Sequence, residues 1–441
     1  MNLRKTIITG SILLGTLFFL SHASADEQLD EFTKALTSGK VKLNVRLRFE
    51  DVDDDAAGLR SAELLSLRTR LGYETGDFRG FKLFGEMEDI REVASIDDYN
   101  DGPNGNGMTE FALIPDPEET ELNQLYLQYG KDYGKTNILI RHGRERQKWD
   151  NDRFIGNVGW RQNEQTYDGT SLVLGFKELG LTVRYAHHTN VNRIFGDQAE
   201  TVGDFNVDSH NFNVNFNKLK FLNATAYYYD WESDEPATNG GGFGEDDDRE
   251  TYGVRTLWNF PVGQTAKLLG TVEYASQDDS GSAENFSSVD YTLFEAGVGF
   301  KLGSVPLTIK VGQETLEGNL DDGESFITPF ATLHAFQGWA DKFLLAGITG
   351  IYGGAGAAGI EDTYVSVGTS LWGTKLLAVY HEYEPDESGT GFSEYGTELN
   401  LLAVKKFGKH YTLGAKYADF SEEDDFTSDT EKLWIWGQIN F

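Results

Sequence analysis

Apolar and polar residues alternate strictly along many short segments of this chain. From residue 41 onwards, Val41, Leu43 and Val45 alternate with Lys42 and Asn44, and the pattern continues to residue 50. A β-strand points successive side chains to opposite faces, so each segment has one apolar and one polar face. In a soluble sandwich the apolar face would meet a second sheet. In a membrane barrel it meets lipid, and the polar face meets water in the lumen.

About eighteen segments follow this pattern, an even number as expected for a bacterial barrel. They lie near 41–50, 62–74, 81–91, 119–130, 136–144, 168–177, 180–189, 207–217, 220–231, 250–259, 265–276, 290–301, 305–316, 361–370, 373–383, 394–405, 410–420 and 430–441. Their connections alternate between tight turns, such as PVG, and long acidic or glycine-rich loops, such as SIDDYNDGPNGNG. Short periplasmic turns and long extracellular loops explain this asymmetry. We predict an all-β fold, a transmembrane antiparallel β-barrel of about 18 strands. We expect the longest gap, about 317–360, to fold partly into the pore.

The last segment ends on an aromatic residue, Phe441. Its apolar face carries Leu433, Ile435, Ile439 and Phe441. Such a strand resembles the recognition signal of the barrel assembly machinery, which we expect as a partner. If Phe441 faces lipid, parity directs Lys432, Trp434 and Trp436 inward. Those indoles either stack on sugar rings, belong to the interfacial aromatic belt or pack against an inserted loop.

The first 25 residues have the features of a secretory signal. Arg4 and Lys5 precede an apolar run over 6–20, and Ala23-Ser24-Ala25 forms a small-x-small cleavage site. The run is too short for a convincing membrane span. We expect residues 1–25 to be a signal peptide, with a retained membrane anchor as the alternative.

Residues 26–39 place Leu29, Phe32 and Leu36 at helical spacing. We predict a short periplasmic N-terminal arm or helix there. The expected organisation is a signal peptide (1–25), this arm (26–39) and an outer-membrane barrel with long extracellular loops (40–441).

Composition excludes several classes of site. The chain has no cysteine, so it has no disulfide and no thiolate site. Its formal net charge of −33 argues against nucleic-acid binding. No Gly-x-Ser-x-Gly elbow or His-Glu-x-x-His signature occurs, so we expect no enzyme and no metal centre. The acidic segments DDYNDGPNGNG and EDDDRE could hold Ca²⁺, but neither has the spacing of a calcium loop, and we expect no cofactor.

The polar faces supply a candidate pore wall. By parity, five arginines point inward: Arg46, Arg48, Arg68, Arg70 and Arg184. Further inward basic residues are Lys42, Lys82, Arg255, Lys267, Lys310, Lys375 and Lys416. Inward acids are Glu50, Glu86, Glu88, Glu273, Glu314 and Glu398. The arginine fork suits carboxylates, and local wall charge sets the field despite the negative total. The alternative is that these charges pair with one another and keep the wall hydrated.

Two blocks carry a resemblance to a known family. The first contains Gly143-Arg144, Asp152-Arg153-Phe154-Ile155-Gly156, Trp160-Arg161-Gln162-Asn163-Glu164-Gln165 and Tyr167-Asp168-Gly169. The second is TPFATLHAFQGWADKF (328–343), followed by Glu361-Asp362 and Tyr364. The chain resembles the alginate-export family of outer-membrane porins over nearly its whole mature length. The resemblance implies an eighteen-stranded monomeric barrel with an arginine-rich pore for anionic polysaccharide. It also implies that Arg144, Arg153 and Arg161 shape the constriction or its supporting loop.

We therefore expect a passive channel in the outer membrane of a Gram-negative bacterium, for anionic oligo- or polysaccharides or similar small anions. The alternative is a general diffusion porin of low selectivity, and a barrel enzyme or an adhesin is far less favoured. The inward glutamates depart from what a polyuronate conduit needs, so the substrate stays open. Expected partners are outer-membrane lipid, lipopolysaccharide, the anionic solute and the assembly machinery, with the chain itself a monomer.

Overall fold

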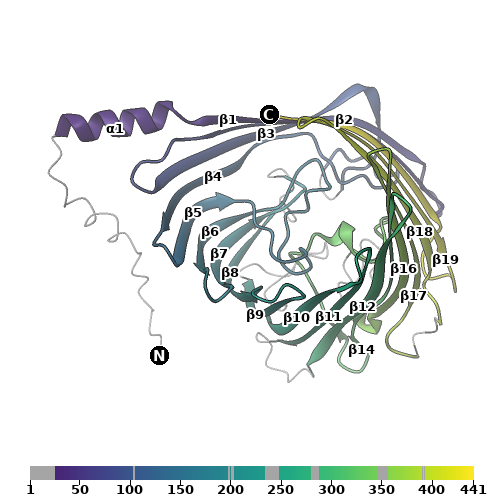
Figure 1. Cartoon of the computed structure of the whole chain (residues 1–441). Helices are drawn as coiled ribbons and strands as arrows, with labels where there is room; N and C mark the ends of the chain where they lie inside the picture. Colours follow the sequence, from purple (N-terminus) through teal and green to yellow (C-terminus); the bar gives the residue numbers. More distant parts are fainter. Residues whose placement is uncertain are drawn as a thin grey trace, which may run out of the picture.

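The computed structural model describes residues 25–102, 105–196, 199, 203–233, 248–279, 288–344, 356–389, 391 and 393–441. The predicted signal peptide lies outside these residues apart from Ala25, and both candidate Ca²⁺ segments lie partly outside them. Eighteen strands form one sheet that closes on itself (Figure 1). Among the described residues, no helix is long and apolar enough to cross a bilayer.

The elements follow the predicted order closely. Helix α1 spans Ala25–Thr37, where the sequence predicts an arm or a helix. The first barrel strands are β1 (Lys40–Asp54), β2 (Ala62–Glu74), β3 (Phe81–Asp98), β4 (Glu119–Asp132), β5 (Thr136–Glu145), β6 (Thr166–Phe176), β7 (Leu181–Asn192), β8 (Asp204–Phe216) and β9 (Leu222–Ser233). The remaining barrel strands are β10 (Arg249–Val262), β11 (Ala266–Asp279), β12 (Val289–Leu302), β13 (Val305–Leu316), β16 (Ile360–Leu371), β17 (Thr374–Glu384), β18 (Gly396–Phe407), β19 (Tyr411–Glu422) and β20 (Thr430–Asn440). The small hairpin β14 (Gly318–Asn319) and β15 (Glu324–Ser325) and the 3-10 turns η1 (Leu333–Ala335) and η2 (Gly356–Ala358) lie between β13 and β16.

Each barrel strand pairs antiparallel with its sequence neighbours, and β1 closes the ring against β20. The prediction of about eighteen strands is confirmed. One boundary was wrong: β3 continues well past residue 91. Its register against β2 shifts between Leu64 and Ser66, and Ala94 and Ser95 have positive φ. This irregular stretch interrupts the alternation on which the boundary was predicted.

The two faces of the wall differ as parity predicts. Ile435 of β20 is 48% exposed, and Phe441, the residue just after the strand, is 60% exposed, as expected for side chains that face lipid. Trp434, by contrast, is fully buried, and Lys432 and Trp436 are buried beside it. Parity counted from Phe441 therefore orients the last strand correctly.

Two connecting loops enter the ring of strands (Figure 1). We call residues 146–165, between β5 and β6, the first inner loop, and residues 326–344 the second inner loop. The apolar core lies between them and the wall, and includes Phe154, Tyr229, Phe326 and Phe330. The prediction that the segment 317–360 enters the lumen is thus confirmed for its described part.

Candidate functional site

Four arginines lie together on the inner faces of β1 and β2. Arg46 lies directly opposite Arg68 in the antiparallel register, Arg48 follows on β1 and Arg70 on β2. All four side chains are buried, Arg48 to 1% exposure. Adjacent buried cations are unfavourable unless carboxylates or other acceptors surround them. The surroundings of this arginine cluster therefore determine what it can do.

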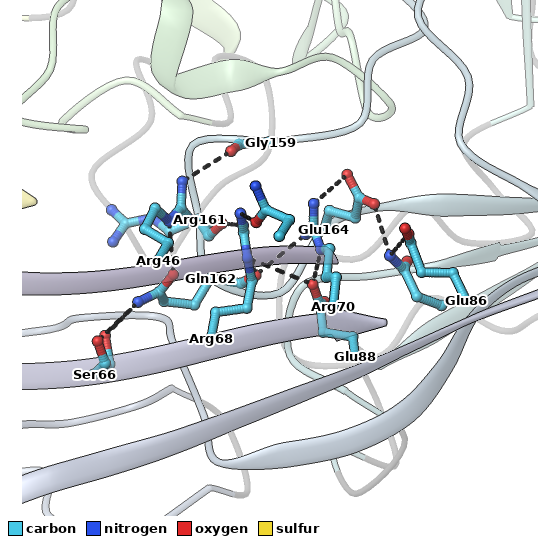
Figure 2. Close-up of polar contacts among 12 residues, drawn as sticks. Arg46, Ser66, Arg68, Arg70, Glu86, Glu88, Gly159, Arg161, Gln162 and Glu164 are labelled. Atoms are coloured by element: carbon cyan, nitrogen blue, oxygen red, sulfur yellow. Dashed lines mark hydrogen bonds and ion pairs between the residues drawn. The ribbon is translucent and has the colours of Figure 1, made fainter. Parts of the chain in front are cut away.

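The first inner loop supplies many of those acceptors (Figure 2). Arg46 Nε donates to the side-chain oxygen of Gln162 at 2.8 Å, and Arg46 Nη1 donates to the carbonyl of Gly159 at 3.3 Å. Arg68 Nη1 donates to the carbonyl of Gln162 at 3.2 Å. Arg48 Nη1 donates to the carbonyl of Trp160 at 2.6 Å. The arginine cluster thus holds the backbone of this loop against the wall.

Two carboxylates surround Arg70 of β2. Arg70 pairs with Glu88 on β3 and, at 3.3 Å, with Glu164 of the first inner loop. Glu164 also accepts from Arg146 Nε at 2.7 Å and from the amide of Asn123 at 2.8 Å. Burial alone would raise the pKa of Glu164, but Arg70 and Arg146 outweigh it and lower the pKa to about 2. Glu164 is therefore an anion at every physiological pH.

A second set of ion pairs joins β1 to the second inner loop. Arg161 bridges Glu50 at 2.9 Å and Asp341 at 2.8 Å. Glu50 and Asp116 both pair with Arg48. The whole network holds six arginines, Arg46, Arg48, Arg68, Arg70, Arg146 and Arg161, and six carboxylates, Glu50, Glu86, Glu88, Asp116, Glu164 and Asp341. With Lys432, which pairs with Asp341 at 3.1 Å, seven cations face six carboxylates, so nearly all of the positive charge is compensated and this is not an open site of free positive charge.

Indole rings of β20 pack against the same loop. Trp160 meets Trp434 and Trp436 edge-on, with ring centroids 5.7 and 5.2 Å apart. Since Trp434 is fully buried, packing against an inserted loop is the alternative that the structure supports. The indole of Trp160 also stacks on His334 at 5.2 Å. Burial lowers the pKa of His334 to about 3, so this imidazole is neutral where it joins the two inner loops.

The second inner loop rests on the first and on β18. Thr332 donates its backbone N–H to the carbonyl of Asp152 at 2.9 Å. Glu398 of β18 accepts the backbone N–H groups of Trp339 and Ala340. Gly338 permits this close approach because its φ is +81° and a Cβ there would overlap the Glu398 carboxylate. Glu398 therefore holds the second inner loop and is not offered to a passing solute.

Replacing Gly338 with alanine is expected to loosen the second inner loop. The substitution adds a strained backbone to a steric overlap, and a non-glycine residue in this conformation alone costs on the order of 1–3 kcal/mol. Single-channel recordings should show current fluctuations that the wild type lacks. Gly323→Ala is the matched control, because Gly323 has a similar φ of +77° and open space where its Cβ would be. Equal traces for both variants would contradict the contact with Glu398.

The structure places the other predicted site residues as follows. Arg153 and Arg161 lie in the first inner loop, and Arg153 Nε meets Glu314 at 2.9 Å. Arg184 lies on the inner face of β7, where Nη1 donates to Asn213 at 3.2 Å. The prediction for Arg144 was wrong about its place. Because β5 extends to Glu145, alternation turns Arg144 outward, opposite the exposed Leu125 and paired with Asp168 at 2.9 Å.

Several residues of the network were missing from the candidate site residues. Asp116 and Asp341 lie on separate loops, so no strand parity reveals that they meet Arg48 and Arg161. Gln162 and Glu164 belong to a conspicuous polar block, but their partners on β1 and β2 depend on how the loop folds. The one sequence feature that could have indicated these contacts is the high density of arginine, glutamine and aspartate in residues 143–169.

Basic groups remain accessible on the wall nearer the short turns. The side chain of Arg141 is 30% exposed and that of Lys310 is 35% exposed, and both lie on the inner face with Arg184. Closer still to the turns, the inner face also carries the exposed Lys42, Lys267 and Lys375 and the partly exposed Lys82. The accessible acids interspersed there include Glu74, between Lys42 and Lys82, and Glu295, beside Lys310. We call this inner surface the basic vestibule.

A sequence model described as alginate export matches residues 39–308, more than half of the chain. The chain belongs to the alginate export family. It is an outer-membrane β-barrel channel, and the family and fold indicate no enzymatic role. No curated protein matches the sequence of this family member.

Solved structures show the same barrel fold at low sequence identity. OccAB4 of Acinetobacter baumannii superposes with a TM-score of 0.66 at 13% identity, covering 91% of this chain and 98% of its own. OccK3 (OpdO) of Pseudomonas aeruginosa gives 0.63 at 13% identity, covering 94% and 98%. The outer membrane protein opdK of Pseudomonas aeruginosa gives 0.63 at 10% identity, covering 91% and 98%. These likenesses establish the barrel fold of this alginate export family member.

Proposed function

We propose that this barrel passes anionic oligosaccharides or similar small anions across the outer membrane. The observation that carries the proposal is the basic vestibule, where Arg141, Arg184 and Lys310 stay accessible while the acids of the network above are buried and paired. A solute at the periplasmic mouth passes the lysines nearest the short turns and then meets these three cations. The formal charge of −33 does not oppose this, because the local wall charge sets the field along the path.

The arginine cluster has an indirect role in the proposed function. Arg46, Arg48, Arg68 and Arg70 donate to the first inner loop and its carboxylates, so they set the shape of the constriction. Arg153 and Arg161 hold that loop to β13 and to the second inner loop. The family name supports a saccharide as solute, and guanidinium and ammonium groups suit a uronate carboxylate.

Removing the three cations Arg141, Arg184 and Lys310 is expected to weaken the preference for anions. A unit charge about 5 Å from an ion is worth about 0.8 kcal/mol in water, so the triple variant Arg141→Gln, Arg184→Gln, Lys310→Gln should lower the anion-to-cation permeability ratio about three- to tenfold. Reversal potentials in planar bilayers under a salt gradient measure this ratio. Lys135→Gln is the control, because Lys135 lies on a tight turn outside the lumen with its side chain 75% exposed.

Saccharide block is the second readout of the same recordings. Oligogalacturonate should interrupt the current of the wild type more often than that of the triple variant, whereas neutral malto-oligosaccharides should not distinguish them. A wild-type channel that prefers cations and is never blocked by oligogalacturonate would refute the proposal.

A general diffusion porin of low selectivity is the second candidate. It is favoured by the nearly balanced network around the arginine cluster, in which six arginines and Lys432 face six carboxylates. In that case the wild-type reversal potential should lie near zero, and charged and neutral saccharides of one size should behave alike.

A further inference from the structure

Two histidines and an aspartate meet on the outer face of the barrel, away from the lumen. His187 of β7 lies directly opposite His210 of β8, and Asp208 lies two residues further along β8 on the same face. The imidazole rings stack at 4.7 Å with an interplanar angle of 9°. Nε2 of His187 lies 2.7 Å from Oδ1 of Asp208, and Nε2 of His210 lies 3.6 Å from the same oxygen. One ligand atom from each residue lies within 4.8 Å of the other two.

These separations are close to those of a tetrahedral metal site. Ligand atoms 2.0–2.1 Å from a tetrahedral Zn²⁺ lie about 3.3 Å from one another. The two measured separations, 2.7 and 3.6 Å, fall on either side of that value. Paired strands hold the three backbone positions together, and the stacked imidazoles must rotate out of their parallel arrangement to direct both Nε2 atoms at one ion.

A neighbouring hydroxyl orients one of the imidazoles. The Tyr185 hydroxyl and Nδ1 of His210 are 2.9 Å apart and share a hydrogen bond. This contact occupies Nδ1 and leaves Nε2 for the cluster. Metal-binding histidines are usually held in this way, through the ring nitrogen that does not bind the metal. A simple surface ion pair of His187 with Asp208 would not require the hydrogen bond between Tyr185 and His210.

The location exposes the three residues to cations. Tyr185 and Phe212, whose rings are 4.7 Å apart, mark the edge of the apolar band, and the cluster lies one step beyond them toward the long loops. All three side chains are at least one-third exposed. On β9, Asp230 lies opposite His210 and adds negative charge that attracts cations.

We propose that His187, Asp208 and His210 form a binding site for a divalent transition metal of the zinc class. Two imidazoles and one carboxylate suit Zn²⁺, whereas Mg²⁺ and Ca²⁺ prefer oxygen ligands alone. Three protein ligands leave a fourth position for water or a head-group oxygen. The metal would join β7 to β8 at the level of the lipid head groups. This inference is independent of the solute that the channel carries.

Calorimetric titration of the untagged, metal-stripped barrel in detergent with ZnCl₂ tests the site. The wild type should bind one Zn²⁺ saturably, and His187→Ala or His210→Ala should weaken that binding at least about thirtyfold. Tyr185→Phe should weaken it about tenfold, the lower end of what loss of a supporting hydrogen bond costs. His142→Ala is the control, because His142 is also exposed but bonds Thr170 outside the cluster. It should bind Zn²⁺ like the wild type.

Three results would overturn the site. One is the absence of saturable Zn²⁺ binding by the wild type. Another is equal binding by the wild type, His187→Ala and His210→Ala, which would mean adventitious binding elsewhere. The third is tighter binding of Ca²⁺ than of Zn²⁺. Heat-modifiable migration on gels verifies that each variant is folded, and Asp208→Asn provides a second variant that keeps both imidazoles.

Discussion

Replacing Glu164 with alanine is expected to free the first inner loop and turn a steady channel current into a fluctuating one. The side chain is buried and pairs with Arg70 at 3.3 Å and with Arg146. It also accepts from the amides of Asn123 and Asn157 at 2.8 and 2.7 Å. Removing one partner of a buried ion pair costs about 3–5 kcal/mol, because the other charge stays buried without compensation.

The size of this free-energy loss determines which measurement can detect it. A loss of about 3–5 kcal/mol changes a docking equilibrium by about two to four orders of magnitude, so undocked states become visible in single-channel recordings. Limited proteolysis should cleave the variant sooner at Lys148, which lies in the same loop. The effect should be the same at pH 5 and pH 8. With the pKa of Glu164 lowered to about 2, the wild-type contribution is complete above pH 4.5 and is lost only as the pH falls toward 2.

Glu178→Ala is the matched control for this variant. Glu178 pairs with Lys135 at 2.8 Å on an exposed turn, with side chains 63% and 75% exposed. Such a surface pair contributes about 0–1 kcal/mol. If Glu178→Ala and Glu164→Ala give the same steady current, the first inner loop is not held by this carboxylate.

Strand parity accounts for how much of the fold could be predicted. Because successive side chains of a β-strand point to opposite faces, counting back from Phe441 correctly placed Lys432 and Trp434 on the inner face of the barrel wall. The same rule placed Arg46, Arg68 and Arg184 inside, where the structure has them. Parity fails where a strand is irregular, as at Ala94 and Ser95 of β3. Arg144 shows a related limit, because its placement depends on where β5 ends.

The site itself depends on contacts that no periodicity encodes. Gln162 meets Arg46 and Arg68 only because the first inner loop folds back across the lumen. Asp341 meets Arg161 from a loop that follows it by 180 residues. Sequence reasoning identified the arginines and left open whether they bind solute or pair with acids. The structure shows them buried against loops, and the accessible cations lie elsewhere on the wall.

Arg153 offers a sharper test of how the inner loops are held. Its buried ion pair with Glu314 can be broken by replacing one partner, or removed completely by replacing both. Its Nε lies 2.9 Å from Glu314 of β13, its Nη1 donates to Thr328 at 3.1 Å, and its guanidinium lies over the ring of Phe336. Arg153→Met keeps much of the side-chain volume but leaves the Glu314 carboxylate without its cation. We expect a loss of about 3–5 kcal/mol in loop docking and a fluctuating current.

The double variant Arg153→Met, Glu314→Gln should recover most of the steady current. Replacing both members of a buried ion pair by neutral groups is often neutral or stabilising, because no charge is left to desolvate. The hydroxyl of Tyr291, 2.7 Å from the Glu314 carboxylate, can still donate to the amide oxygen. Arg153 can hold the loop by compensating the charge of Glu314 or by its contacts with Thr328 and Phe336. Conductance histograms of the single and double variants separate these two roles. If the double variant fluctuates as much as the single one, the guanidinium acts through its contacts with Thr328 and Phe336, and charge compensation is not what fixes the inner loops.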